Sequence, residues 1–160
     1  MKSYKKTIRS FEKNYDKKSI RKLSGLKNHF SNKKEVQDIL KKKDPVVYEV
    51  FIKEFSPISL GLTVINPGNI KKEFYFTAGH VHKGKTPEFY ILLEGKGKLL
   101  IQKGKLKTIN MKKGKISLIP EGYAHRLVNT GNKKLKVLTI YHEDSKPSYN
   151  VKFKRRFFRK

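Results

Sequence analysis

From residue 46 onward the chain is a succession of short apolar segments separated by turn sequences, with no helical pattern between them. The segments are rich in β-branched, aromatic and aliphatic residues, and the turns contain Gly, Pro or Asn. Strands this short and this regularly spaced are typical of an all-β sandwich or barrel. The segments expected to form strands are 46–52, 60–65, 73–77, 88–93, 98–102, 105–109, 116–119, 125–129 and 135–141.

The first 45 residues have a different pattern. Residues 1–31 are Lys-rich with scattered apolar side chains, which predicts an irregular or weakly strand-like arm. One short helix should follow, because Asn32 can cap it with Glu35 three residues later and Asp44-Pro45 ends it. We therefore expect an N-terminal arm with one short helix (1–45), a barrel (46–150) and a basic tail (151–160) that is either a closing strand or a disordered end.

The chain is strongly basic, with 39 Lys and Arg against 13 Asp and Glu and a formal net charge of +26. Such a charge is common in nucleic-acid-binding proteins, because basic side chains neutralise phosphates. Most of the excess is Lys rather than Arg, however, and it is spread along the chain without any RRM, KH, zinc-finger or helix-turn-helix signature. A solvated cationic surface is the preferred interpretation, and we expect no specific nucleic-acid partner.

Composition also limits the compartment and the chemistry. The sequence has no Cys, which excludes disulfides and thiol chemistry. No apolar run approaches the roughly 18 residues of a membrane span, and the first ten residues lack the apolar stretch of a secretory signal. We expect a cytoplasmic protein of one domain, without membrane contact.

Candidate metal ligands are concentrated in two short stretches. His80 and His82 are two residues apart, so in an extended segment their side chains share a face. This H-x-H pattern alone is weak evidence for a metal site. Glu88 lies far enough along to return on a neighbouring strand, and His125 follows a tight Pro/Gly turn. Imidazole nitrogens together with a carboxylate form a site for a divalent transition metal.

Both stretches resemble the two motifs of the cupin superfamily. Residues 114–129 match G-x5-P-x-G-x2-H-x3-N without a gap, and residues 80–95 read H-x-H-x5-E-x6-G, one residue longer than is usual between histidine and glutamate. Phe74 stands where the first motif generally has a glycine. Within the superfamily, the chain is similar over about residues 19–149 to the archaeal-type glucose-6-phosphate isomerases. The segments that carry this similarity are 19–24, 44–50, 66–68, 72–82 and 124–129.

This resemblance implies a cupin jelly-roll β-barrel, a homodimer, and interconversion of glucose 6-phosphate and fructose 6-phosphate in glycolysis and gluconeogenesis. It also implies one divalent metal ion per subunit, held by His80, His82, Glu88 and His125. Fe²⁺ is expected, with Mn²⁺, Ni²⁺, Co²⁺ or Zn²⁺ as alternatives. Four protein ligands on an octahedral ion leave two positions for adjacent sugar oxygens, which suits proton transfer between C2 and C1 through a cis-enediolate.

The resemblance further implies roles for individual residues. Glu88 is expected to be the base as well as a ligand, and Tyr90 to bind the sugar or orient Glu88, although an ordinary barrel aromatic is the alternative for Tyr90. Pro147 stands where relatives can carry a histidine, so any proton transfer by that histidine is absent here. The residues that match the family's phosphate and hydroxyl contacts are Tyr48, Thr63, Thr77, the backbone of Gly79, Tyr90, Tyr141 and Tyr149.

Two other classes of protein would keep the same four ligands. One is another metal-dependent cupin enzyme, such as a different sugar isomerase, a dioxygenase or a decarboxylase, which has no reason to keep Tyr48, Thr63 and Thr77. The other is a non-catalytic cupin that binds a sugar or regulates transcription. A regulator is disfavoured, because we expect no attached DNA-binding domain.

Overall fold

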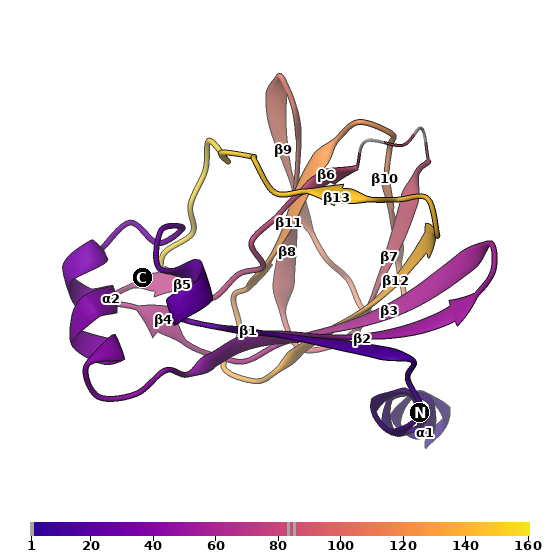
Figure 1. Ribbon diagram of the computed structural model, residues 1–160, viewed down its shortest axis with the longest axis horizontal. Coiled ribbons are helices and arrows are strands. Elements are labelled where there is room, and N and C mark those ends of the chain that lie inside the picture. The colour runs from indigo at the N-terminus through magenta and orange to yellow at the C-terminus, as the bar shows by residue number, and fades with distance from the viewer. Residues whose placement is uncertain (1, 83, 85) are drawn as a thin grey trace.

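Two antiparallel sheets form the body of the computed structural model, which describes residues 2–82, 84 and 86–160 and, within these, the side chains from residue 8 onward. Figure 1 shows the sheets enclosing a common interior. The larger has the strand order β1-β2-β3-β12-β7-β10, formed by β1 (Lys17–Lys22), β2 (Val46–Phe55), β3 (Ile58–Ile65), β12 (Leu135–His142), β7 (Glu88–Glu94) and β10 (Ile116–Ile119). The smaller has the order β11-β8-β9, formed by β11 (Ala124–Asn129), β8 (Gly97–Lys103) and β9 (Lys105–Asn110).

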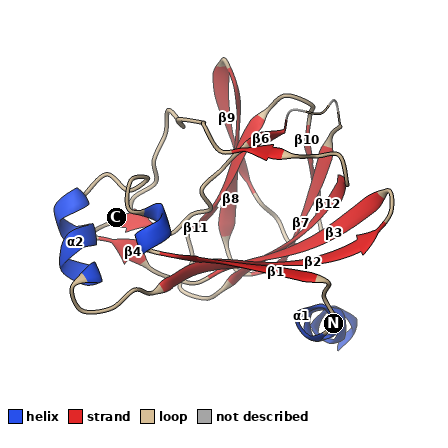
Figure 2. Cartoon of the chain, viewed as in Figure 1, coloured by secondary structure: helices blue, strands red, loops and turns tan. Residues whose placement is uncertain are grey.

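Short strand pairs and helices complete the fold, and Figure 2 shows how far strands outweigh helices. The strand pairs are β4 (Asn69–Ile70) with β5 (Glu73–Phe74), and β6 (Val81–His82) with β13 (Pro147–Ser148). The helices are α1 (Lys2–Lys13), the 3₁₀ turn η1 (Ser24–Leu26) and α2 (Lys33–Leu40). In the described part of the chain, no helix has the length and apolar character that crossing a membrane requires.

The expected strand pattern is confirmed. β10 covers the expected residues 116–119, and most of the other strands differ from expectation by a few residues at their ends. The expected strand 73–77 is shorter, with β5 ending at Phe74 and Phe76 in an isolated bridge to Val128. The β7–β8 turn depends on Gly95, which has a φ of +89°, and a Cβ there would lie 2.5 Å from the Lys134 carbonyl oxygen.

The barrel interior joins residues from both sheets. Val47, Ile65 and Leu92 of the larger sheet belong to one buried cluster with Leu99 and Leu127 of the smaller sheet. Apolar residues at alternate strand positions point into this cluster, as the alternation in the sequence requires. The cluster fills one part of the interior and leaves the remainder for the cavity described below.

The capped helix is also confirmed. α2 begins after Asn32, whose side chain accepts a hydrogen bond from the backbone N–H of Glu35 at 2.9 Å. Val36 is the buried residue of this helix and packs into the main core.

The N-terminal arm differs from the expectation, which included a single helix. Residues 2–13 form a further helix, α1, and only β1 has the strand-like character that was expected. Ile8 and Phe11 of α1 pack against a second buried cluster that includes Phe51 and Leu62, on strands β2 and β3. In Figure 1 the helix lies outside the larger sheet. This contact joins residues distant in sequence, so the local pattern of the arm did not indicate it.

Residues 151–159 run along the surface of the barrel. Phe153 and Phe157 pack against the main core, and the N–H of Phe74 donates to the carbonyl oxygen of Phe157 at 3.1 Å. The N–H of Arg159 likewise donates to the carbonyl oxygen of Lys72 at 2.7 Å. The division of the chain at residues 45 and 150 stays a prediction.

Candidate metal centre and cavity

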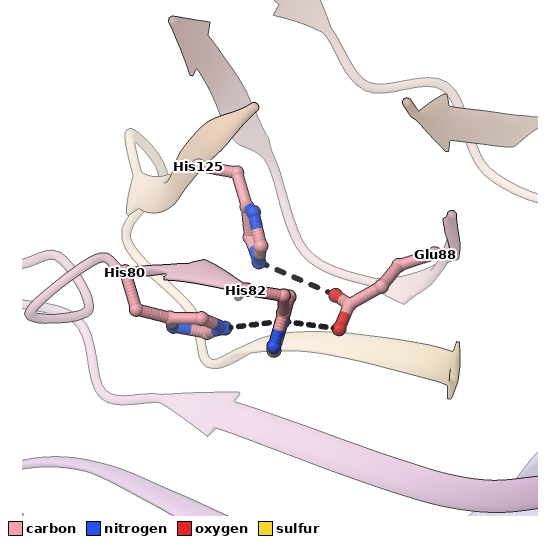
Figure 3. Close-up of side chains that lie close together, drawn as sticks. All are labelled: His80, His82, Glu88 and His125. Atoms are coloured by element: carbon pink, nitrogen blue, oxygen red, sulfur yellow. Dashed lines mark hydrogen bonds and ion pairs between the residues drawn. The ribbon is translucent and has the colours of Figure 1, made fainter. Parts of the chain in front are cut away.

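Three histidines and one glutamate from three neighbourhoods of the fold meet at one point. The metal-binding atoms of His80, His82, Glu88 and His125 all lie within 4.8 Å of one another. Figure 3 shows these side chains close together. His80 directly precedes β6, His82 lies on β6, Glu88 begins β7, and His125 lies on β11. The structure therefore brings together all four of the ligands expected from the sequence.

The contacts within the cluster leave imidazole nitrogens directed at its centre. The Nδ1 of His125 lies 3.1 Å from the Tyr123 carbonyl oxygen, a contact that places the proton on Nδ1 and the lone pair on Nε2. That Nε2 is buried, 3.3 Å from Glu88 Oε2, and has no hydrogen-bond partner in the described part of the chain. The Nε2 atoms of His80 and His82 are 2.9 Å apart, and His82 Nε2 also contacts Glu88 Oε1.

The protonation states also suit a divalent cation. Burial, together with the neighbouring charges of His125 and His82, lowers the pKa of His80 to about 3. Burial alone would raise the pKa of Glu88, but the close contacts with the His125 and His82 imidazoles outweigh it and lower the value to about 2. A neutral imidazole and an ionised carboxylate are the forms that bind a metal. The unpartnered His125 nitrogen and this donor set fit a divalent transition-metal ion.

The cluster lies in the wall of a cavity of about 230 Å³. The residues that the sequence predicted to contact a substrate all line this cavity: Tyr48, Thr63, Thr77, Gly79, Tyr90, Tyr141 and Tyr149. They come from different strands and loops, so their convergence could not follow from sequence spacing alone. The structure therefore gathers the predicted metal ligands and the predicted substrate contacts around one space.

The hydroxyls of Tyr90 and Tyr141 are hydrogen-bond donors at neutral pH. Burial and the nearby Glu88 charge raise the pKa of Tyr90 well above its usual value, and the same two causes raise the pKa of Tyr141 to about 12. The Tyr90 ring lies edge-on to His125 with ring centres 5.5 Å apart, and Tyr149 is 5.7 Å from His80 in the same sense. The rings of Tyr90 and Tyr149 therefore lie beside the His/Glu cluster.

Other hydroxyls are partly engaged by the backbone. The Tyr48 hydroxyl accepts a hydrogen bond from the Ala78 N–H at 3.4 Å, and Thr77 Oγ1 accepts one from the Leu127 N–H at 3.1 Å. Each hydroxyl retains its own proton for donation into the cavity. Pro147 pairs with His82 across the β6–β13 ladder, so it lies beside the cluster.

Several cavity residues were missed in the sequence. They are Ser19, Arg21, Thr139 and Ser145, together with apolar wall residues such as Val50, Ile52 and Leu127. Ser19 and Arg21 reach the cavity because β1 pairs with β2, which no local pattern reveals. Ser145 is held by a 2.7 Å hydrogen bond between its hydroxyl and that of Thr86. Two signals could have found Ser19 and Arg21: their i, i+2 spacing, and their place in the segment 19–24 that resembles the isomerase family.

A further missed residue, Arg126, supports the ligand strands from behind. Its guanidinium is buried between the rings of Phe76 and Phe153, 4.4 and 4.5 Å from their centres, and donates to the Ala78 carbonyl oxygen at 2.7 Å. Phe153 also covers Gly79, where an added Cβ would lie 2.5 Å from the ring. Segment 151–159 therefore packs against the backbone that leads to His80.

Comparisons with known proteins agree with this site. Residues 17–159 match the family model described as glucose-6-phosphate isomerase (GPI). The glucose-6-phosphate isomerase of Pyrococcus abyssi is 38% identical over 148 residues, covering 88% of this chain and 78% of that protein. That of Thermococcus kodakarensis is 40% identical over 140 residues, covering 83% and 74%.

A solved structure supports the fold alone. An oxalate decarboxylase from Bacillus subtilis, studied for its Mn(II) centres, matches with a TM-score of 0.53 and 21% identity, over 66% of this chain and 29% of that one. With a family model that covers most of the chain, and relatives that are 38% and 40% identical over more than four fifths of it, the chain belongs to the cupin-type glucose-6-phosphate isomerase family.

Proposed function

We propose that this protein interconverts glucose 6-phosphate and fructose 6-phosphate with the help of a divalent metal ion bound by His80, His82, Glu88 and His125. The observation that carries the proposal is the cavity, which the four-residue cluster and the full set of predicted sugar contacts line together. Membership of the isomerase family supplies the substrate class. Another cupin activity would explain the cluster but would give no reason for Tyr48, Thr63 and Thr77 to line the same space.

The donor set restricts the metal without naming it. Three imidazole nitrogens and a carboxylate suit Fe²⁺, which we expect, and also Mn²⁺, Ni²⁺, Co²⁺ and Zn²⁺. The fold match to a Bacillus subtilis protein with Mn(II) centres is consistent with a metal-binding protein of this fold. The chemistry that a bound divalent ion supplies is polarisation of the sugar carbonyl and acidification of the neighbouring C–H.

The side chains around the cluster can move and hold the protons of the reaction. We assign Glu88 as the base that carries a proton between C2 and C1, through a cis-enediolate. Its low pKa makes it a weak base as long as His82 and His125 contact both of its oxygens, so proton transfer requires at least one contact to be released. Tyr90, protonated at neutral pH, can donate to a sugar oxygen or to Glu88.

The phosphate and the sugar hydroxyls are assigned to the remaining cavity groups. The hydroxyls of Tyr48, Thr63 and Thr77 and the backbone N–H of Gly79 can donate to phosphate oxygens. Tyr141 and Tyr149 are placed to contact the sugar. No side chain takes the place of the histidine that relatives can carry at Pro147.

We further propose that the enzyme is a cytoplasmic homodimer. An exposed apolar patch on the outer side of β7 and β10 supports self-association, since Phe89, Ile116 and Leu118 are 39%, 65% and 50% exposed. Leu118 pairs directly with Phe89 across these strands, which makes the patch continuous.

The proposal is tested by assaying the purified protein with fructose 6-phosphate after removing metal with a chelator and after reloading it with each candidate ion. We expect glucose 6-phosphate from the reloaded protein and almost none from the stripped protein. A reaction run in D₂O should introduce deuterium at C2, as expected for an enediolate. Metal-loaded protein that makes no glucose 6-phosphate would overturn the proposal, and activity on oxalate instead would identify a different cupin enzyme.

A further inference from the structure

The edge strand of the larger sheet contributes to the cavity. β1 pairs with β2 so that Arg21 lies opposite Tyr48 and Ser19 opposite Val50. Residues paired across an antiparallel ladder point to the same side of the sheet. Tyr48 and Val50 line the cavity, and Arg21 and Ser19 line it with them. The Arg21 side chain therefore lines the cavity on the same side of the sheet as Tyr48.

The Arg21 charge is free to receive a ligand. The lysines at the start of β1 are paired with carboxylates, Lys17 with Glu54 at 2.7 Å and Lys18 with Glu49 at 2.8 Å. Within the described part of the chain, no salt bridge involves Arg21. Burial raises the pKa of Tyr48, and the Ala78 N–H and then the Arg21 charge oppose that rise, in keeping with the pairing of Arg21 opposite Tyr48.

Arg21 and the His/Glu cluster lie on different strands of the cavity wall. Glu88 and the histidines belong to β7, β6 and β11, whereas Arg21 lies on β1, with β2, β3 and β12 between β1 and β7 in the sheet. Apart from the histidines, Arg21 is the one basic side chain among the described residues that line the cavity. Despite a net charge of +26, the cavity thus presents a single guanidinium.

We propose that Arg21 binds the phosphate group of the substrate together with the Tyr48 hydroxyl that it faces. The guanidinium fork matches phosphate oxygens in pairs, and Tyr48 donates one more hydrogen bond. The phosphate and the carbonyl carbon are at different ends of the sugar, so a phosphate held by Arg21 leaves the carbonyl end for the cluster. Arg21 thereby selects phosphorylated over free sugars. This inference rests on the proposed function for its substrate, but its phosphate site is testable without turnover.

The test uses the metal-loaded full chain and its Arg21→Gln and Arg21→Lys variants. Calorimetry measures binding of inorganic phosphate and fructose 6-phosphate, and kinetics give kcat and KM. We expect Arg21→Gln to weaken both ligands and raise KM by about 10- to 100-fold, with metal content unchanged and kcat less affected. Arg21→Lys keeps the positive charge but loses the guanidinium fork. Its phosphate affinity and its KM should therefore lie between those of Arg21→Gln and those of the parent protein.

The matched control is Lys22→Gln, which removes the same charge from the adjacent exposed residue, outside the cavity lining. It should leave phosphate binding unchanged. Equal effects of Lys22→Gln and Arg21→Gln, unaltered phosphate binding in Arg21→Gln, or no phosphate binding by the parent protein would each overturn the inference. Phosphate binding that depends on Arg21 in a protein without isomerase activity would support the anion site and reject the proposed function.

Discussion

The backbones of His80 and His125 are hydrogen-bonded to each other in both directions. The N–H of His125 donates to the His80 carbonyl oxygen at 2.8 Å, and the N–H of His80 donates to the His125 carbonyl oxygen at 3.1 Å. The two imidazole rings lie 4.3 Å apart between centres. Because this bridge uses only backbone atoms, removing either side chain leaves the other in place.

We therefore expect His125→Ala to remove metal without unfolding the protein. Metal content and isomerase rate should both fall by more than about 100-fold, because a direct ligand matters more than the outer groups that typically contribute 10- to 100-fold. His80→Ala and Glu88→Gln should act in the same way. Elemental analysis and activity are measured beside circular dichroism, with His142→Ala as the control outside the cluster. Full metal occupancy and full rate in the ligand variants would refute the site.

The packing around Arg126 predicts that a substitution outside the four ligands also weakens metal binding. Phe153→Ala opens one face of the guanidinium and removes the ring that covers Gly79, so the backbone before His80 should become mobile. We expect metal transfer to a chelator to speed up by roughly 10-fold, as for other groups that support ligands. Phe158→Ala, in the same segment but 51% exposed, is the control. Identical release rates for the two variants would contradict this role.

Stability of the metal-free protein should fall with acid. The pKa of His80 drops from its usual 6.5 to about 3 in the fold. Below pH 6.5 the unfolded chain therefore binds a proton at His80 that the folded chain does not, and this favours the unfolded state. The pKa of Glu88 drops from 4.5 to about 2, and its contribution is lost as the pH falls below 4.5. Both pKa shifts therefore make the folded protein less stable as the pH falls.

The melting temperature should therefore decline from pH 6.5 downward, with a further component below pH 4.5. A His80→Asn variant lacks the first titrating group, so its melting temperature should change less between pH 6.5 and 4.5. Thermal scans of the stripped proteins at matched ionic strength provide the measurement. Parallel curves for the parent and the variant would show that His80 is not the group responsible.

The cap of α2 should affect stability alone. Asn32→Ala removes the acceptor of the Glu35 N–H and should lower the free energy of unfolding by about 1 kcal/mol. Asn32→Asp keeps an acceptor and should retain most of the stability. Because the helix does not line the cavity, kcat and KM should stay unchanged in both variants, as urea titration and the isomerase assay can establish. A kinetic change would mean that α2 communicates with the site.

The large positive charge should influence encounter with the substrate. A field of this sign attracts a dianionic sugar phosphate, and added salt screens it over about 10 Å at 0.1 M. We expect kcat/KM for fructose 6-phosphate to fall as sodium chloride rises, provided that binding limits the rate. A kcat/KM that does not change with salt would show that the surface lysines do not help to attract the substrate.

The strands and the metal cluster were predictable because their signals are local. Alternating apolar residues and glycine turns define β7, β8 and β10, and the His80-x-His82 spacing places two imidazoles on one side of an extended segment. What the sequence did not reveal depends on contacts between distant residues. α1 is stabilised by packing against β2 and β3, and Arg21 reaches the cavity through the pairing of β1 with β2.

The strand order has a consequence for how the protein folds. β12 lies between β3 and β7, so the larger sheet cannot close until the chain near residue 140 inserts between strands formed much earlier. Pairing of such distant segments makes folding slow, typically milliseconds to seconds. Glu88 lies on β7, which β12 joins to β3 and the rest of the larger sheet. A metal ion that binds the four ligands of the folded protein stabilises the finished barrel by mass action.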